Sequence, residues 1–264
     1  MAVRVDLEAI NKLLGGLYPG EVLNIFGPYL SGKTLLTTQL SYYLMQEFGK
    51  AVLIDIDGGG RIFVNSWDPI FRKRYPKAGE MKVVTAFNKK HQAQKKLKID
   101  LTIFELFGVK AYVELSEGGK GQFTAYGICD SLVEKLAKEG YKVFIIDSFS
   151  QIFKDSFPGV QSFGERARAE DMLFSLVKMF LQDNPDSFFF LNHHVSVNPM
   201  TQHMEPAGGS AVVQNSKLGI MIAKRIKEDR GRIFVYRHPT KPPWSEYADI
   251  VYTEAGIFDA ERVE

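Results

Sequence analysis

Residues 27–34 read Gly-Pro-Tyr-Leu-Ser-Gly-Lys-Thr, and this stretch decides the fold. A glycine, four further residues and then Gly-Lys-Thr is typical of loops whose backbone amides surround a phosphate group. The helix after such a loop adds the positive end of its dipole, the lysine reaches the outer phosphate oxygens, and the hydroxyl binds magnesium. Here an apolar segment precedes the loop and a segment of helical period follows it. We therefore expect a nucleoside-triphosphate site, with Lys33 on the phosphates and Thr34 on magnesium. The expected nucleotide contacts are Gly27, Pro28, Tyr29, Leu30, Ser31, Gly32, Lys33, Thr34 and Leu35.

Composition bounds the class of protein. Of the 264 residues, 45% are hydrophobic and 24% charged, which is an ordinary globular composition and suits one domain over residues 1–264. No apolar run is long enough to cross a bilayer and the N-terminus has no apolar leader, so we expect a cytoplasmic protein without a membrane partner. The single cysteine excludes an internal disulfide. A net charge of +2 does not demand a nucleic-acid partner, although a local basic surface is compatible with it.

Alternating apolar and helical segments predict an α/β fold, a mostly parallel twisted sheet with helices on both faces and a C-terminal antiparallel hairpin. The expected strands are 21–26, 51–56, 82–86, 142–147, 187–191, a hairpin of 218–226 with 232–237, and short pieces at 250–253 and 256–258. The expected helices are 6–14, 33–48, 61–75, 125–139 and 165–181. Asp6 is expected to cap the first helix. Residues 101–115 fit either type of element.

Acidic side chains end two of the expected strands. Asp147 ends the apolar segment 142–147, where it can hold magnesium through a water molecule opposite Thr34. Asp55 and Asp57 both end the second strand, and an acid is needed there to orient or deprotonate the attacking water. Because side chains alternate along a strand, both carboxylates can share one face, and the pattern does not choose between them.

Other segments extend the pattern on both sides of the loop. Residues 13–28 read LLGGLYPGEVLNIFGP. Later segments are LIDIDG at 53–58, IIDS at 145–148, FLNH at 190–193, PAGG at 206–209, HP at 238–239 and TEAGIFD at 253–259. In this order they resemble the RecA/RadA and KaiC group of ATPases, over nearly the whole chain except about 65–125. The resemblance implies a RecA-like P-loop core.

The resemblance also assigns roles position by position. Asp57 stands where the family has its catalytic glutamate, and His193 stands at the glutamine that senses the γ-phosphate. Lys224 and Arg225 fall where filament-forming members extend basic fingers into a neighbouring subunit. A solvated pair on the hairpin is the alternative interpretation of these two residues.

Three departures from the family pattern predict weak hydrolysis. Asp57 is one methylene shorter than glutamate, and a misplacement near 1 Å can lower a rate about a hundredfold. Leu30 replaces a small residue beside the phosphates. The charge of His193 depends on its local environment. We therefore expect ATP binding with slow, magnesium-dependent hydrolysis.

The segments that bind single-stranded DNA in RecA relatives carry few cations here. Residues 148–162 contain only Lys154, and residues 195–214 contain no lysine or arginine. Because phosphate neutralisation dominates such affinity, we expect at most weak binding through these loops. The most basic segment is 89–98 (KKHQAQKKLK), which is either a solvated surface or a contact for DNA or a protein partner.

Three functional hypotheses follow. The first is a recombinase paralog that resembles the short archaeal RadA paralogs (RadB-like and KaiC-like forms), binds ATP and modulates recombination and DNA repair. The second is a KaiC-like regulatory ATPase or autokinase, and the third is a nucleotide-gated interaction module without turnover. Only 26 residues precede the loop, too few for the N-terminal DNA-binding domain of full-length recombinases, so long filaments are not expected. A monomer, self-association and assembly with a recombinase all remain open.

Overall fold

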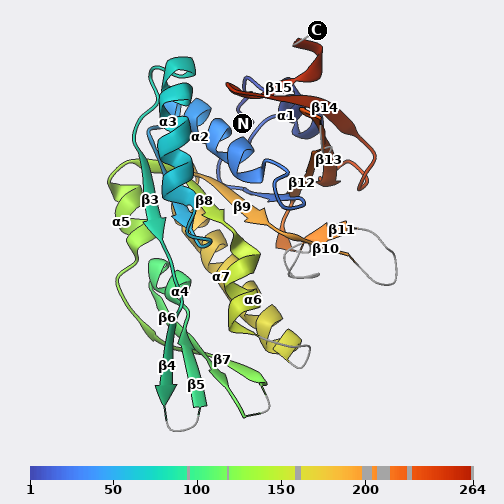
Figure 1. Ribbon diagram of the computed structural model, residues 1–264. Coiled ribbons are helices and arrows are strands. Elements are labelled where there is room, and N and C mark those ends of the chain that lie inside the picture. The colour runs from blue at the N-terminus through green and yellow to red at the C-terminus, as the bar shows by residue number, and fades with distance from the viewer. Residues whose placement is uncertain are drawn as a thin grey trace.

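Among the residues that the structure describes, nine strands form one mixed sheet (Figure 1). The computed structural model describes residues 1–93, 96–117, 119–157, 162–197, 204–206, 215–224 and 228–262. The sheet consists of β1 (Val22–Phe26), β2 (Lys50–Asp55), β3 (Met81–Thr85), β8 (Tyr141–Asp147), β9 (Phe188–His193), β12 (Leu218–Lys224), β13 (Arg230–Arg237), β14 (Tyr247–Thr253) and β15 (Gly256–Asp259). Its strand order is β15-β14-β13-β12-β1-β9-β8-β2-β3. The pairs between β12 and β3 are parallel, whereas those between β12 and β15 are antiparallel. The expected α/β fold with a C-terminal antiparallel hairpin is confirmed.

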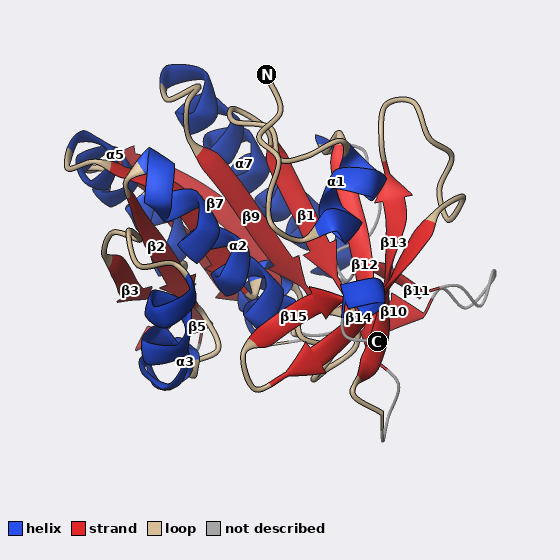
Figure 2. Cartoon of the chain, turned by 90° about the horizontal axis from the view of Figure 1, so that it is seen from above, coloured by secondary structure: helices blue, strands red, loops and turns tan. Residues whose placement is uncertain are grey.

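Side chains of the buried strands alternate between two hydrophobic clusters, one on each face of this sheet. In β8, Val143 and Ile145 join one cluster, and Phe144 and Ile146 join the other. The first cluster includes side chains from α1 (Glu8–Leu14), α2 (Lys33–Phe48) and α3 (Gly60–Arg74). The second includes side chains from α4 (Thr102–Leu106), α5 (Leu132–Lys138), α6 (Phe149–Ser156) and α7 (Phe163–Asp183). Figure 2 shows α2 and α7 on opposite sides of the sheet. The central strands are mostly apolar because both of their faces are covered.

A second sheet of four antiparallel strands lies between β3 and α5 in the sequence. Its strands are β4 (Lys89–Ala93), β5 (Lys96–Asp100), β6 (Val109–Leu115) and β7 (Gly121–Ile128), and they pair in chain order. One face packs into the second cluster through Ile99, Val113 and Phe123. Figure 1 shows this small sheet extending away from α1 and the C-terminal strands.

The helix expected over 125–139 is wrong in its first half. Ala125 pairs with Ala111 of β6, so the start of that stretch completes a strand of the small sheet. The helix itself, α5, begins at Leu132, where the hydroxyl of Ser131 accepts a hydrogen bond from the backbone N–H of Glu134 (3.2 Å). Pairing with a neighbouring strand therefore outweighs the local helical pattern.

The other expected elements agree with the structure, with shifts of a few residues at their ends. The ambiguous stretch 101–115 contains both α4 and β6, and the expected loop 148–162 contains α6. The remaining short elements are β10 (Val195–Val197), which pairs with β11 (Met204–Pro206), and a 3₁₀ helix at Ala260–Arg262. None of the described helices is long and apolar enough to span a lipid bilayer.

The start of α1 is capped from the opposite end of the sequence. The carboxylate of Asp259 accepts hydrogen bonds from the backbone N–H groups of Glu8 (2.9 Å) and Ala9 (2.6 Å). Asp6, the expected cap, instead accepts hydrogen bonds from Arg74 (2.7 Å) and the hydroxyl of Tyr75 (2.6 Å). The expectation is wrong because a carboxylate from β15 reaches the helix end that a local residue usually satisfies.

Candidate functional site

The loop between β1 and α2 fits closely against neighbouring backbone. A Cβ atom added to Gly27 would lie 2.2 Å from the carbonyl oxygen of Ile222 in β12, so a larger residue would force the strands apart. The N–H of Ser31 donates to the carbonyl of Pro28 (3.2 Å) and closes a turn. Gly32 has a φ of 92°, a left-handed conformation that glycine adopts without strain, and it leads directly into α2. The loop therefore lies at the carboxyl end of β1 with its geometry set by the sheet.

The first turn of α2 offers backbone amides to this loop. The first four N–H groups of an α-helix have no acceptor within the helix, and here the N-cap, Gly32, supplies no side chain. The first turn carries no acidic residue to offset the positive end of the helix dipole. Leu30 is 76% exposed, so its side chain extends into solvent. This arrangement suits an anion.

Lys33 is buried at the base of the loop. Its side chain is 7% exposed, and its ammonium group donates to the carbonyl oxygens of Gly27 and Pro28, both at 2.9 Å. Burial lowers the pKa of Lys33, while the nearby carboxylates of Asp147 and Asp57 oppose the shift. The lysine thus ties the two ends of the loop together from within and places a cation beside two acids.

Thr34 and Asp147 are in direct contact across the sheet edge. The hydroxyl of Thr34, in the first turn of α2, donates a hydrogen bond to the carboxylate of Asp147 at the end of β8. Burial raises the pKa of Asp147, and hydrogen bonds from Thr34 and Asn192 oppose that shift. Because the Thr34 hydroxyl is the donor in its hydrogen bond to Asp147, the lone pairs of its oxygen stay available to bind a metal ion. Hydroxyl and carboxylate oxygens are ligands that magnesium prefers, so this pair fits that ion.

The structure separates the two acids that the sequence left open. Asp55 is buried, and its two carboxylate oxygens accept hydrogen bonds from the backbone N–H groups of Gly58 and Gly60, each at 2.9 Å. Asp57 has a side chain that is 43% exposed, and its carboxylate lies 3.7 Å from Nε2 of His194. Asp55 therefore shapes the turn into α3, whereas Asp57 faces the surroundings of Lys33 and Asp147.

His193 lies inside the protein on the other face of the sheet. Its ring is fully buried, Nε2 is 2.8 Å from Oδ1 of Asn24, and the ring packs edge-on against Phe149. Burial lowers the pKa of His193 to about 3, so the ring is neutral at ordinary pH. In this arrangement His193 has no direct access to a ligand in the loop.

Asn192 faces the side where the loop lies and was missed by the sequence reasoning. Its side-chain amide donates to the hydroxyl of Thr37 in α2 (3.2 Å), and it contributes a hydrogen bond to Asp147. Phe188 and Phe190 of the same strand belong to the first hydrophobic cluster, the one that includes α2. Because side chains alternate along a strand, Asn192 must lie on that same face. That regularity is the signal that would have found it.

The C-terminal strands contact the loop through Tyr252 of β14. Its hydroxyl donates to the carbonyl of Ser31 (2.7 Å), and a Cβ atom on Gly32 would lie 2.7 Å from its ring. Lys224, a residue expected to reach a neighbouring subunit, lies over this ring with its ammonium 4.7 Å from the ring centre, and 3.7 Å from Asp229. Arg225, its expected companion, falls outside the described residues.

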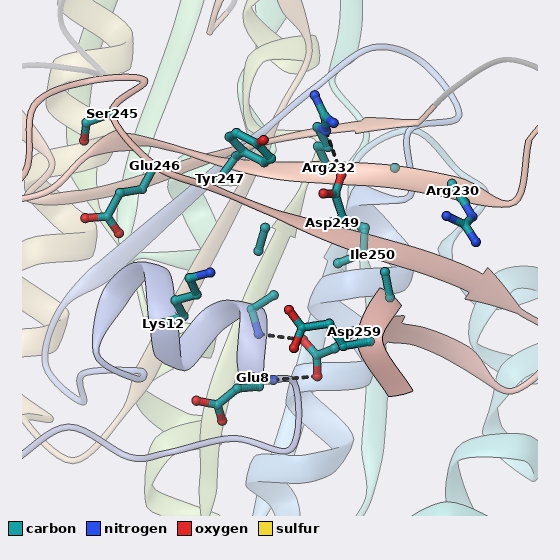
Figure 3. A pocket seen from close by; sticks show the side chains of 15 residues that line it. Glu8, Lys12, Arg230, Arg232, Ser245, Glu246, Tyr247, Asp249, Ile250 and Asp259 are labelled. Carbon is teal, nitrogen blue, oxygen red and sulfur yellow. Dashed lines mark hydrogen bonds and ion pairs between the residues drawn. The ribbon is translucent and has the colours of Figure 1, made fainter. Parts of the chain in front are cut away.

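A groove lies elsewhere, between α1 and strands β13 and β14 (Figure 3). It has a volume of about 760 Å³ and is lined by none of residues 27–35. Its polar groups pair with one another: Arg232 contacts Asp249 at 2.7 Å, and Asp259 caps α1. These contacts explain the groove's polar lining as part of the C-terminal architecture.

The two segments expected near DNA are described only in part. Residues 149–156 of the first form α6, with Lys154 on its exposed side. Of the second, residues 195–197 and 204–206 form the β10–β11 pair, and its other members lie outside the described residues. Basic residues 89–98 correspond to strands β4 and β5, with residues 94 and 95 outside the description.

Comparisons by sequence add no relative. No family model matches the chain, and no curated protein matches it.

Proposed function

We propose that this protein binds ATP with magnesium at the loop of residues 27–34 and hydrolyses it slowly, as a RecA-like paralog that modulates recombination and DNA repair. The observation that carries the proposal is the meeting of four features at one sheet edge. They are a glycine-bounded loop, a buried lysine inside it, the open N-terminus of α2, and the contact between Thr34 and Asp147. Together they suit a triphosphate and a divalent cation.

The topology supports a ligand site at this loop. In open α/β sheets, ligands bind at the carboxyl ends of parallel strands where the connections diverge to opposite faces. Here β1 lies between β9 and β12, the connection after β1 runs through α2 on one face, and the helix before β9, α7, lies on the other. The loop follows β1 at that point.

Each group near the loop has a role in the proposal. The amides at the start of α2 and the ammonium of Lys33 would hold phosphate oxygens. Thr34 would bind magnesium directly and Asp147 through a water molecule, and the ion would offset charge on the phosphates. Asp57 is an exposed acid whose charge acts on Lys33, and it would accept the proton of the attacking water.

Slow hydrolysis follows from the positions of two side chains. Asp57 is short and lies near His194, which competes for its carboxylate. His193 is buried and bonded to Asn24, so it cannot contact a γ-phosphate without moving. These observations also favour a second candidate, a nucleotide-gated interaction module that binds ATP without turnover.

Replacing Lys33 by alanine tests the binding site. A charged hydrogen bond contributes about 1.5–3 kcal/mol, so Lys33→Ala should weaken ATP binding by roughly 10- to 100-fold in titration calorimetry. Lys217→Ala is the matched control, because Lys217 pairs with Glu21 near the start of β12, at the opposite edge of the sheet. Thermal unfolding of both variants shows whether the fold is kept. Unchanged affinity in a folded Lys33→Ala protein contradicts the proposal.

Labelled ATP, followed with and without single-stranded DNA, separates the functions. Slow release of labelled phosphate supports the ATPase, and acceleration by DNA supports a role in recombination. Tight binding without release supports the gated module. Label transferred onto the protein itself, with no effect of DNA, would indicate a KaiC-like autokinase and contradict the proposed function.

A further inference from the structure

The small sheet has a second face that points away from the core, defined here as the outer face. Its residues alternate with the buried Ile99, Val113 and Phe123 along the strands. The outer face comprises Lys89, His91, Lys98, Asp100, Lys110, Tyr112, Glu114, Gln122, Thr124 and Tyr126. One face of the sheet is therefore fixed by packing, and the other presents polar and aromatic groups.

Two tyrosine rings lie side by side on this face, one on β6 and one on the end strand β7. The ring centres of Tyr112 and Tyr126 are 5.4 Å apart. Tyr126 is 54% exposed. The ammonium of Lys98 lies 3.9 Å from the centre of the Tyr112 ring and 5.3 Å from that of Tyr126. The two rings are inclined by 58° to one another, and the arrangement places a cation beside both of them.

The charge around these rings favours an anionic partner. Residues 87–99, which supply β4 and most of β5, contain five lysines and no aspartate or glutamate. Asp100 on the outer face already contacts His91 at 2.9 Å and Lys98 at 3.9 Å. Lys110 is exposed next to the tyrosine pair on β6. On the outer face itself, Lys89, Lys98 and Lys110 stand against Asp100 and Glu114, which leaves a small excess of positive charge.

We propose that the outer face of the small sheet binds single-stranded DNA, with bases stacked on Tyr126 and Tyr112 and phosphates held by Lys98 and Lys110. Aromatic rings on an open strand surface stack unpaired bases, and flanking cations follow the backbone. An acidic peptide would satisfy the lysines and leave the tyrosine surface without a partner. The choice of DNA over RNA rests on the proposed role in recombination. The outer face itself does not require ATP to be bound at the loop.

The test is fluorescence anisotropy of a labelled oligothymidine of about 16 nucleotides, within the span of known single-strand sites, without ATP. Tyr126→Ala should weaken binding about tenfold or more, and Tyr126→Phe should bind like the wild type because the ring is kept. Tyr247→Ala is the matched control. Tyr247 is 48% exposed on another antiparallel strand, with the guanidinium of Arg232 lying 4.6 Å from its ring centre.

Salt and competitors complete the test. Lys110→Gln should reduce the slope of log affinity against log salt by about 0.7, the value for one phosphate contact on a single strand. A duplex of equal length should bind more weakly, since its bases are already stacked. The proposal is overturned if Tyr126→Ala binds the oligonucleotide like the wild type, or if Tyr247→Ala loses as much affinity as Tyr126→Ala. It is also overturned if oligouridine binds more tightly than oligothymidine, or if poly-glutamate binds with an affinity that Tyr126→Ala does not change.

This test fails separately from that of the nucleotide site. Lys33→Ala should retain full DNA affinity, because Lys33 lies at the carboxyl end of β1 and not on the small sheet. Loss of DNA binding in Tyr126→Ala with intact ATP binding assigns the defect to the outer face. Normal DNA binding in a protein that binds no ATP would support the proposed DNA site on the outer face and contradict the proposed nucleotide site.

Discussion

Asp55 and Asp57 are two residues apart and lie in different surroundings. Asp55 accepts from two backbone amides in a buried position, and loss of such an acceptor costs about 1–3 kcal/mol. We expect Asp55→Ala to lower the melting temperature by roughly 3 to 10 °C in calorimetry. Asp57→Asn should leave the melting temperature unchanged, because the side chain is half exposed.

Asp57 is also predicted to affect the rate of ATP turnover. Removal of a group that accepts the proton from water usually lowers a rate by about a hundredfold, so Asp57→Asn should reduce ATP turnover by that order. The measurement is phosphate release at saturating ATP. Full turnover in Asp57→Asn would show that another group activates the water, and an unshifted melting temperature in Asp55→Ala would show that the turn into α3 does not depend on its cap.

Residue patterns in the sequence indicate part of the candidate site and miss the rest. The loop, Lys33, Thr34 and Asp147 could be found because each is fixed by local spacing or by the end of an apolar strand. Tyr252 could not, since its hydrogen bond to Ser31 joins residues 221 positions apart. The burial of His193 was also out of reach, because the polar partner it meets, Asn24, sits on a different strand.

At the scale of elements, the packing of α6 on α7 predicts a pH dependence. Burial raises the pKa of Glu170 in α7 to about 7, while Arg166 and Lys154 oppose the shift and Asp171 adds to it. The folded protein therefore keeps a proton that the unfolded chain loses near pH 4.5. Stability is highest below pH 4.5 as far as this group is concerned, and it falls as the pH rises to about 7.

Glu170→Gln isolates this contribution. Between pH 5 and pH 8 the wild type should lose about 2 to 3 kcal/mol of unfolding free energy relative to the variant, since glutamine has no charge to bury. Urea unfolding at the two pH values measures the difference, and groups common to both proteins cancel. Parallel pH profiles for the two proteins would mean that Glu170 is ionised in the fold.

Elements of the large sheet were easier to predict than those of the small one. A strand such as β8 is apolar from Val143 to Ile146 because both faces are covered there, and helix α2 begins directly after the Gly-Lys-Thr motif. Residues 125–128 have no such marker. Their strand conformation depends on pairing with β6, and β6 follows a turn and a five-residue helix that local patterns do not resolve.

At the scale of the whole molecule, α6 joins the candidate nucleotide site to the small sheet. It begins directly after Asp147 and Ser148. The hydroxyl of Ser150 in this helix accepts a hydrogen bond from the backbone N–H of His194 (3.2 Å). At the other end, the amide of Asn88 donates to Ser156 (2.6 Å) and to the carbonyl of Ile152 (3.2 Å), just before β4. A shift of α6 would reach both regions.

This connection predicts coupling between the two proposed ligands. Single-stranded DNA should change ATP affinity, and ATP should change DNA affinity by the same factor, as thermodynamic linkage requires. Asn88→Ala should bring that factor close to one while each ligand alone binds normally. Asn184→Ala, which removes an amide before β9 at the opposite sheet edge, should keep the coupling. An unchanged factor in Asn88→Ala would exclude α6 as the link.

The cap that Asp259 places on α1 has a consequence for biosynthesis. The two partners are separated by 251 positions, so α1 leaves the ribosome long before the carboxylate that completes it exists. At about 5–20 residues per second the delay is on the order of 10 to 50 s. During that interval a helix of seven residues is too short to be stable alone. Its apolar side chains lack their packing partners from the C-terminal strands until those strands are synthesised.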